Sequence, residues 1–264
     1  MDSPGANETV AADAGIAQMS FTERLVGVYL EPTKTYADIG RKRSWVALFV
    51  LICIVALACS YALQSRMDPA DAAVKGLAMT KPIFKKFMSS DQLAQIEDQA
   101  AKQAMQPRTF RAKYLPIVVT PIMLYITYVV ITTVFLLAFL ATGAGLSFKK
   151  CFTAVIWGFG PPALVVSLLS ILFIFLKNPA DLDINPVNNV VSNLGPLVDF
   201  NAHPALNSLF SSIDIFPLWT AILLSMGFAA QSEGKLTAGK AAIPIVSLWI
   251  LWILLKMGFW AILG

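Results

Sequence analysis

Residues 211–230 read SSIDIFPLWTAILLSMGFAA, a stretch with one charged side chain, Asp214, followed by a long apolar run. From Ile215 to Ser232 there are 18 consecutive uncharged residues. A helix rises about 1.5 Å per residue, so this length is close to the minimum that crosses about 30 Å of hydrocarbon. The sequence therefore predicts a membrane-spanning helix over residues 213–231 that begins beside an acidic residue.

The whole chain has the composition of a membrane protein. Of its 264 residues, 57% are hydrophobic and 14% are charged, whereas an ordinary soluble domain has about 25% charged residues. We predict an all-α polytopic integral membrane protein with five transmembrane helices. The expected spans are about 45–63, 114–141, 151–176, 213–231 and 241–263.

The segment before the first span predicts an amphipathic helix. Ser20-Phe-Thr-Glu23 has the form of a capping box, and Phe21, Leu25, Val28 and Tyr29 follow on one helical face. We interpret this as a helix lying in the cytoplasmic interface of the membrane. The alternative is a helix docked on the protein's own surface. Residues 1–19, which are small and polar, are predicted to be a disordered tail.

Two connections are long enough to carry structure of their own. Residues 64–113 contain helix-starting signals, Asp68-Pro69 and Ser89-x-x-Gln92, and predict a helical extracytoplasmic loop with many basic residues. The basic residues fit a lipid-headgroup or partner surface, or a simply solvated helical face. Residues 177–210 form a polar loop whose asparagines and prolines exclude a full span and favour an interfacial or re-entrant hairpin.

The distribution of Lys and Arg predicts the orientation. Basic residues precede the first span and occupy the connections at Lys149-Lys150 and Lys235–Lys240, while no basic residue follows Lys256. The positive-inside rule then places the amino terminus in the cytoplasm and the carboxyl terminus on the extracytoplasmic side. The basic loop 64–113 does not fit this count, but its length reduces the weight of its charges.

The sequence offers little catalytic chemistry. It holds one histidine, His203, so a His-based zinc cluster cannot form, and it has no Gly-x-Ser-x-Gly elbow or Walker loop. No cofactor, metal or nucleic acid is expected, the last because the basic residues are scattered between apolar runs. A lipid-acting membrane enzyme would have to rely on His203 and Asp199.

Two ionisable residues fall within predicted spans, where charge is costly and functional candidates are sought. Asp214 starts the fourth span and Lys256 lies near the outer end of the fifth, so we predict an intramembrane ion pair between them. The alternatives are that Asp214 caps its helix and that Lys256 extends outward to the interface. A third feature, Trp157-Gly-Phe-Gly-Pro-Pro162, predicts a helix break of the kind found in transporters or a plain packing kink.

Several short motifs are similar to a known family. They are Leu30-Glu-Pro32 with Tyr36 and Ile39, Gly158-Phe159 with Pro161, Leu197-Val-Asp199, and Asp214-Ile-Phe216 with Trp219. In these motifs the chain resembles the Yip-type (Ypt/Rab-interacting protein) domain family, and most closely its short bacterial members. The resemblance implies five spans, a cytoplasmic amino terminus and a bacterial plasma (inner) membrane. The Asp-Leu-x-Gly-Pro motif of the eukaryotic members is missing, which argues against binding of a Rab-type GTPase.

We therefore expect a non-enzymatic scaffold, adaptor or membrane-organising protein. The expected partners are membrane lipids and an unidentified membrane or cytoplasmic protein, with a second copy of the chain, as a homo-oligomer, as an alternative. The competing hypothesis is a small permease or channel that uses Asp214, Lys256 and the Gly-Pro-Pro break. Specific partners on native purification would favour the first hypothesis, and substrate-dependent flux in liposomes the second.

Overall fold

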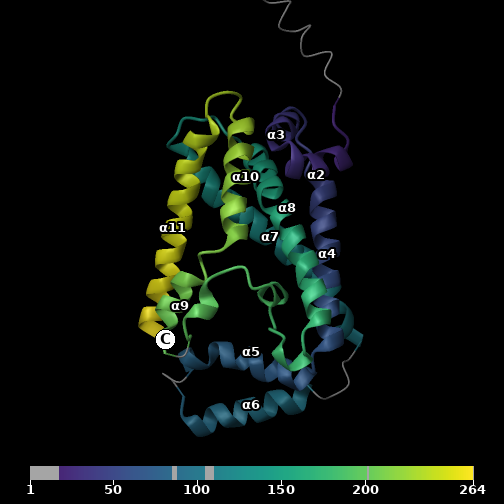
Figure 1. Cartoon of the computed structure of the whole chain (residues 1–264), viewed down its shortest axis with the longest axis vertical. Coiled ribbons are helices and arrows are strands. Elements are labelled where there is room, and N and C mark those ends of the chain that lie inside the picture. Colours follow the sequence, from purple (N-terminus) through teal and green to yellow (C-terminus); the bar gives the residue numbers. More distant parts are fainter. Residues whose placement is uncertain (1–17, 85–87, 105–109, 201, 264) are drawn as a thin grey trace, which may run out of the picture.

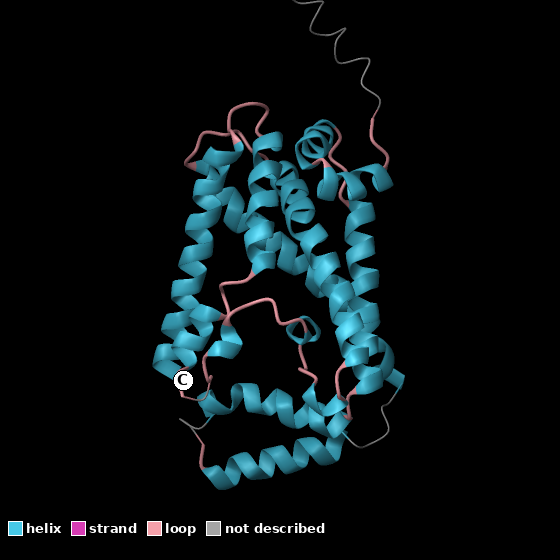
Figure 2. Ribbon diagram, viewed as in Figure 1, coloured by secondary structure: helices cyan, strands magenta, loops and turns pink. Residues whose placement is uncertain are grey.

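The structure, a computed structural model, describes residues 18–84, 88–104, 110–200 and 202–263, so most of the predicted tail 1–19 lies outside the described residues. Within these ranges the regular secondary structure is helical (Figure 2). The only β-type pairing among the described residues is one isolated bridge between Asn193 and Asp214. The helices are α2 (Phe21–Leu30), α3 (Pro32–Arg41), α4 (Val46–Arg66), α5 (Pro69–Phe84), α6 (Ser90–Ala104), α7 (Phe110–Leu140), α8 (Phe148–Leu176), α9 (Pro204–Phe210), α10 (Ile215–Gln231) and α11 (Ala238–Leu263). The predicted all-α class is confirmed.

Four helices are long and apolar enough to cross a membrane by length and composition: α4, α7, α8 and α11. They run along the long axis of the molecule (Figure 1). Helices α2 and α3 lie at its upper end in this view, and α11 ends near its lower end. The first and last described helices therefore approach opposite ends of the bundle.

Helix α10, the predicted fourth span, is shorter than the other four. Its 17 residues rise about 25 Å, and its final turn packs on α3, where the amide Nε2 of Gln231 lies 3.4 Å from the carbonyl oxygen of Ile39. Figure 1 shows α10 beginning near the middle of the long axis rather than at the lower end. The helix lies within the predicted stretch 213–231, and its last turn belongs to the packing against α3.

The largely irregular segment 177–214, which includes the short helix α9, continues the path from α10 to the lower end (Figure 1). It contains three short 3-10 helices, η1 (Pro179–Asp181), η2 (Pro186–Asn189) and η3 (Gly195–Leu197). Asparagine side chains satisfy its backbone: Asn189 Nδ2 donates to the carbonyl of Asp183, and Asn207 Nδ2 donates to the carbonyls of Gly195 and Val198. Internal partners of this kind are what irregular backbone needs at membrane depth, and they account for the many asparagines.

Helix α8 is the centre of the core and packs against α4, α7 and α10. The side chain of Trp157 is completely buried there. Gly158 allows α10 to approach closely, because a Cβ atom at this position would lie 2.4 Å from Cδ2 of Leu224. The bundle is thus assembled around the residues that the sequence marked as a helix-breaking run.

The predicted helical loop is formed by α5 and α6, which lie across the lower end of the bundle (Figure 1). Both expected helix starts are confirmed. The carboxylate of Asp68 accepts the backbone N–H of Ala70, and the Ser89 hydroxyl accepts the N–H of Gln92. The ammonium of Lys75 joins α5 to the 177–214 segment by donating to the carbonyls of Ala180 and Leu182.

Candidate functional site

A buried ion pair holds the two amino-terminal helices together. The Arg24 guanidinium on α2 lies 2.6 Å from the Asp38 carboxylate on α3, and their side chains are 2% and 3% exposed. Arg24 also donates to the carbonyl of Lys42 and to the hydroxyl of Ser44. Two charges taken out of water remain stable only with such complete pairing. We call the α2–α3 unit, residues 21–41, the cap.

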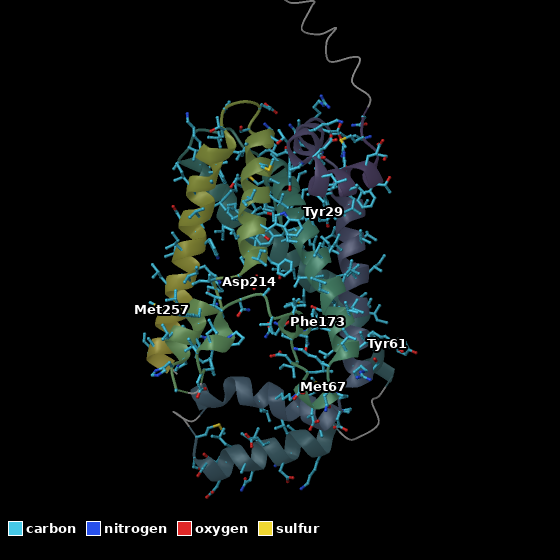
Figure 3. The ribbon with its side chains drawn as sticks, viewed as in Figure 1. Tyr29, Tyr61, Met67, Phe173, Asp214 and Met257 are labelled. Carbon is cyan, nitrogen blue, oxygen red and sulfur yellow. The ribbon has the colours of Figure 1, made fainter. Side chains whose placement is uncertain are left out.

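The cap docks on α8 through two tyrosine hydroxyls. Tyr36 donates to the carbonyl of Trp157 at 2.7 Å, and Tyr29 donates to the carbonyl of Pro161 at 3.1 Å. Pro161 has no N–H, so the carbonyl of Trp157 has lost its usual partner four residues later, and Tyr36 supplies the replacement. Figure 3 shows Tyr29 in the upper half of the bundle, the half in which the cap lies.

The Gly-Pro-Pro run therefore does not break α8, which continues from Phe148 to Leu176 with Pro161 and Pro162 inside it. The continuous helix contradicts a transporter-type break and leaves the alternative, a packing kink, as the prediction for this run. The cap satisfies the carbonyl that Pro161 frees. Burial raises the pKa of the Tyr36 hydroxyl well above its usual value, since the phenolate would lose its hydration. Tyr36 thus stays protonated as a donor.

Close backbone approaches complete the contact of the cap with α10. A Cβ on Gly40 would lie 2.9 Å from the carbonyl oxygen of Ala230, and a Cβ on Gly227 would lie 3.2 Å from the Tyr36 ring. Trp219 of α10 packs against Tyr29 with 5.7 Å between ring centroids. The inner face of the cap is therefore buried in protein, as in the docked alternative, while Val26 and Leu30 stay 54% and 75% exposed and can face a lipid interface.

The structure shows where several residues of the family motifs lie. Pro32 is the first residue of α3, and Gly158 and Pro161 lie under the cap and α10. Phe159 and Phe216 line an apolar groove between α7, α8, α10 and α11. Asp199 is exposed in the loop before α9, and its carbonyl accepts the backbone N–H of His203 at 2.9 Å.

The loops beside the cap carry a second cluster of charges. The Glu233 carboxylate lies 3.0 Å from the Arg43 guanidinium and 2.8 Å from the Lys150 ammonium. The hydrogen bond from Lys150 and its charge lower the pKa of Glu233, because both favour the carboxylate. The cluster links the start of α4, the start of α8 and the α10–α11 turn at one end of the molecule.

Asp214 is the amino-terminal cap of α10. One carboxylate oxygen accepts the N–H of Phe216 at 2.8 Å and the other accepts the hydroxyl of Ser192 at 2.8 Å. Among the described residues, no ion pair joins Asp214 to Lys256, which is half-buried on α11. Figure 3 shows Asp214 near the middle of the long axis and Met257, the neighbour of Lys256, on α11. The geometry follows the capping alternative for Asp214, since both of its oxygens already have partners.

Replacing Asp214 with Ala should lower the free energy of unfolding by about 1–2 kcal/mol, the usual cost of a lost helix cap. The reason is that the Phe216 N–H and the Ser192 hydroxyl both lose their acceptor. Unfolding in mixed detergent and SDS micelles measures the change. Lys256→Met is the matched control. If it costs as much as Asp214→Ala, and the double variant costs no more than either, the ion pair is present and the capping account fails.

Sequence reasoning missed Arg24, Asp38, Ser44 and the role of Trp157, although one signal was available. Arg24 lies three residues after Phe21 and four before Val28, on the apolar face of α2, where an arginine needs a buried acceptor. For the enzyme alternative, His203 and Asp199 are both exposed, and neither lines the apolar groove. The described residues contain no group of three or more His, Cys, Asp or Glu side chains suited to a metal ion.

Comparison with known proteins adds one match. A family model described as the Yip1 domain matches residues 26–259. No curated protein and no solved structure matches the chain. The matched region includes most of the cap, all of α4, α7, α8 and α10, and most of α11.

Proposed function

Because this chain belongs to the Yip1 domain family, we propose that it is a non-enzymatic scaffold or adaptor that presents its cap to a protein partner at the membrane surface. The buried Arg24–Asp38 pair carries this proposal. Together with the tyrosine hydrogen bonds, the pair holds the cap in one orientation on α8. A rigidly held surface costs little ordering entropy when a partner binds.

The long loop 64–113 contains nine basic residues, but the short connections at the cap end are also basic, and these have more weight in the positive-inside rule. Exposed or partly exposed cations at this end are Lys34, Arg41, Lys42, Arg43, Lys149, Lys150, Lys235 and Lys240. The positive-inside rule supports a cytoplasmic location for the cap and an extracytoplasmic carboxyl terminus. We accordingly propose a bacterial inner membrane, with the cap facing the cytoplasm.

The outward face of α3 is the surface that we assign to the partner. Lys34, Ala37 and Arg41 are exposed along it, while Thr35, Tyr36, Asp38 and Ile39 point into the protein. This division leaves one side of a short helix free for contact without disturbing the docked side. The exposed Val26 and Leu30 on α2 are assigned to the lipid interface.

The features that suggested a permease have structural explanations. Helix α8 continues through Pro161 and Pro162, and Asp214 caps α10. Neither observation favours flux, so the scaffold is the function that we propose.

Site-specific photo-crosslinking in native membranes tests the proposal. A photoreactive residue in place of Lys34 or Ala37 should give a discrete crosslinked protein, because these positions lie on the exposed face of α3. The matched control is the same residue in place of Tyr61, which is 75% exposed on α4. Products are identified by mass spectrometry. Crosslinks to lipid alone from both cap positions, with the chain recovered alone from mild extracts, would contradict the scaffold role.

A further inference from the structure

An apolar groove of about 820 Å³ lies between α7, α8, α10 and α11. Its walls are mainly aliphatic and aromatic, with Phe135, Phe159, Phe216, Trp249 and Trp252 among them. The hydroxyl of Thr127, one of its few polar groups, donates to the carbonyl of Met123 in its own helix. Sites of this size accept small molecules or lipid chains, and these walls favour hydrocarbon.

A lysine, Lys256, follows the groove-lining residues on the same face of α11. On α11 the groove is lined by Ile245, Trp249 and Trp252, and Lys256 follows at helical spacings of 11, 7 and 4 residues on the same face. Leu255, its neighbour, also lines the groove. Lys256 is half-buried and belongs to none of the ion pairs that the described part of the chain contains.

Asp214, which shortly precedes the groove residue Phe216 in the sequence, already has hydrogen-bond partners. Phe216 and Pro217 line the groove, but the Asp214 carboxylate before them is held by the Phe216 N–H and the Ser192 hydroxyl. Lys256, one helical turn after Trp252 of the groove, is thus complementary to an anion supplied from outside the chain.

We propose that the groove binds the acyl chain of an anionic phospholipid whose phosphate pairs with Lys256. Seven residues separate Lys256 from the end of α11 at Leu263, about 10 Å of helix rise. A lysine side chain can direct its ammonium over part of that distance toward the interface. The apolar walls of the groove hold the acyl chain, and the Lys256 ammonium selects a lipid with a negatively charged headgroup.

A second copy of the protein fits the groove less well. A helix seated against α11 would cover Lys256 with apolar side chains and leave an unpaired ammonium in a low-dielectric site, which is costly. A lipid phosphate supplies the missing counter-charge. The inference does not depend on the scaffold role, because it concerns a different face of the molecule.

Native mass spectrometry of the full chain in detergent tests the proposal, with phosphatidylglycerol and phosphatidylcholine of identical acyl chains as probes. The wild type should retain phosphatidylglycerol about fivefold more strongly, the order expected for one lysine near anionic lipid. Lys256→Gln should abolish that preference without abolishing retention of either lipid. The matched control, Lys177→Gln, removes a cation at the end of α8 that is outside the groove and should leave the preference unchanged.

A second pair of variants tests whether the groove binds the acyl chain. Val130→Trp narrows the groove from α7 and should lower retention of both lipids severalfold, and Leu251→Trp does so from α11 if the first variant folds poorly. Ile122→Trp, on an exposed part of α7 outside the groove, should not. Equal lipid retention by the wild type, Lys256→Gln and Val130→Trp would overturn the proposal. So would a lipid-free dimer that Val130→Trp dissociates, because the occupant would then be a second copy.

Discussion

Asp38→Ala is expected to lower the free energy of unfolding by about 3–5 kcal/mol, the usual cost of removing one partner from a buried ion pair. The Arg24 guanidinium would keep its buried position, 2% exposed, without the carboxylate that lies 2.6 Å from it. The variant should also release the cap from α8. Unfolding in mixed detergent and SDS micelles measures the first effect, and the rate of trypsin cleavage at Arg41-Lys42-Arg43 measures the second.

The control for this variant is Glu31→Ala. Glu31 lies 3.1 Å from Lys34, but their side chains are 62% and 72% exposed, and exposed pairs contribute about 0–1 kcal/mol. The double variant Arg24→Leu with Asp38→Leu should recover much of the lost stability, since it removes both charges together. If Asp38→Ala is no more destabilising than Glu31→Ala, the cap is not held by a buried pair.

Local signals explain why much of the fold was predictable from sequence. A helix start depends on a side chain that accepts a backbone N–H two or three residues later. The side chains of Ser20, Asp68 and Ser89 accept the N–H groups of Glu23, Ala70 and Gln92 in this way. Long uncharged runs predicted α4, α7, α8 and α11 because hydropathy, like a helix start, can be read from a single segment of the sequence.

The docking of the cap could not be predicted because it depends on partners far apart in the chain. The Trp157 carbonyl freed by Pro161 is satisfied by Tyr36, 121 residues away. The sequence placed Gly158 in a helix break or kink, yet in the structure it allows close contact with Leu224. The packing of the end of α10 on α3 likewise depends on distant partners, Gln231 with Ile39 and Ala230 with Gly40.

Helix α8 presents different residues to the two proposed sites. Trp157 and Pro161 offer their carbonyls to the cap, whereas Phe159 and Pro162 line the apolar groove. Gly158 and Gly160 permit close packing of α10 and α4, respectively, on the same part of α8. The cap that carries the proposed partner surface and the proposed lipid groove therefore both pack on α8.

Trp157→Ala is expected to lower the free energy of unfolding by about 3–5 kcal/mol, the usual cost of a large aromatic residue removed from a core. The side chain is fully buried, and its Nε1–H donates to the Ser44 carbonyl at 2.7 Å. The variant would leave a cavity beside Phe21, whose ring centroid lies 6.4 Å from that of Trp157. The same micelle unfolding assay measures the loss.

Two further variants separate the contributions of this side chain. Trp157→Phe keeps an aromatic ring but leaves the Ser44 carbonyl unpaired, so its cost should be smaller, about 1–3 kcal/mol. Tyr61→Ala removes an aromatic side chain that is 75% exposed and should change stability by about 0.5 kcal/mol or less. Because the Tyr36 hydrogen bond goes to the Trp157 backbone, it is available in every variant, and faster trypsin cleavage of the cap in Trp157→Ala would report lost packing. Equal stability of Trp157→Ala and Tyr61→Ala would mean that α8 does not form the core on which the cap is docked.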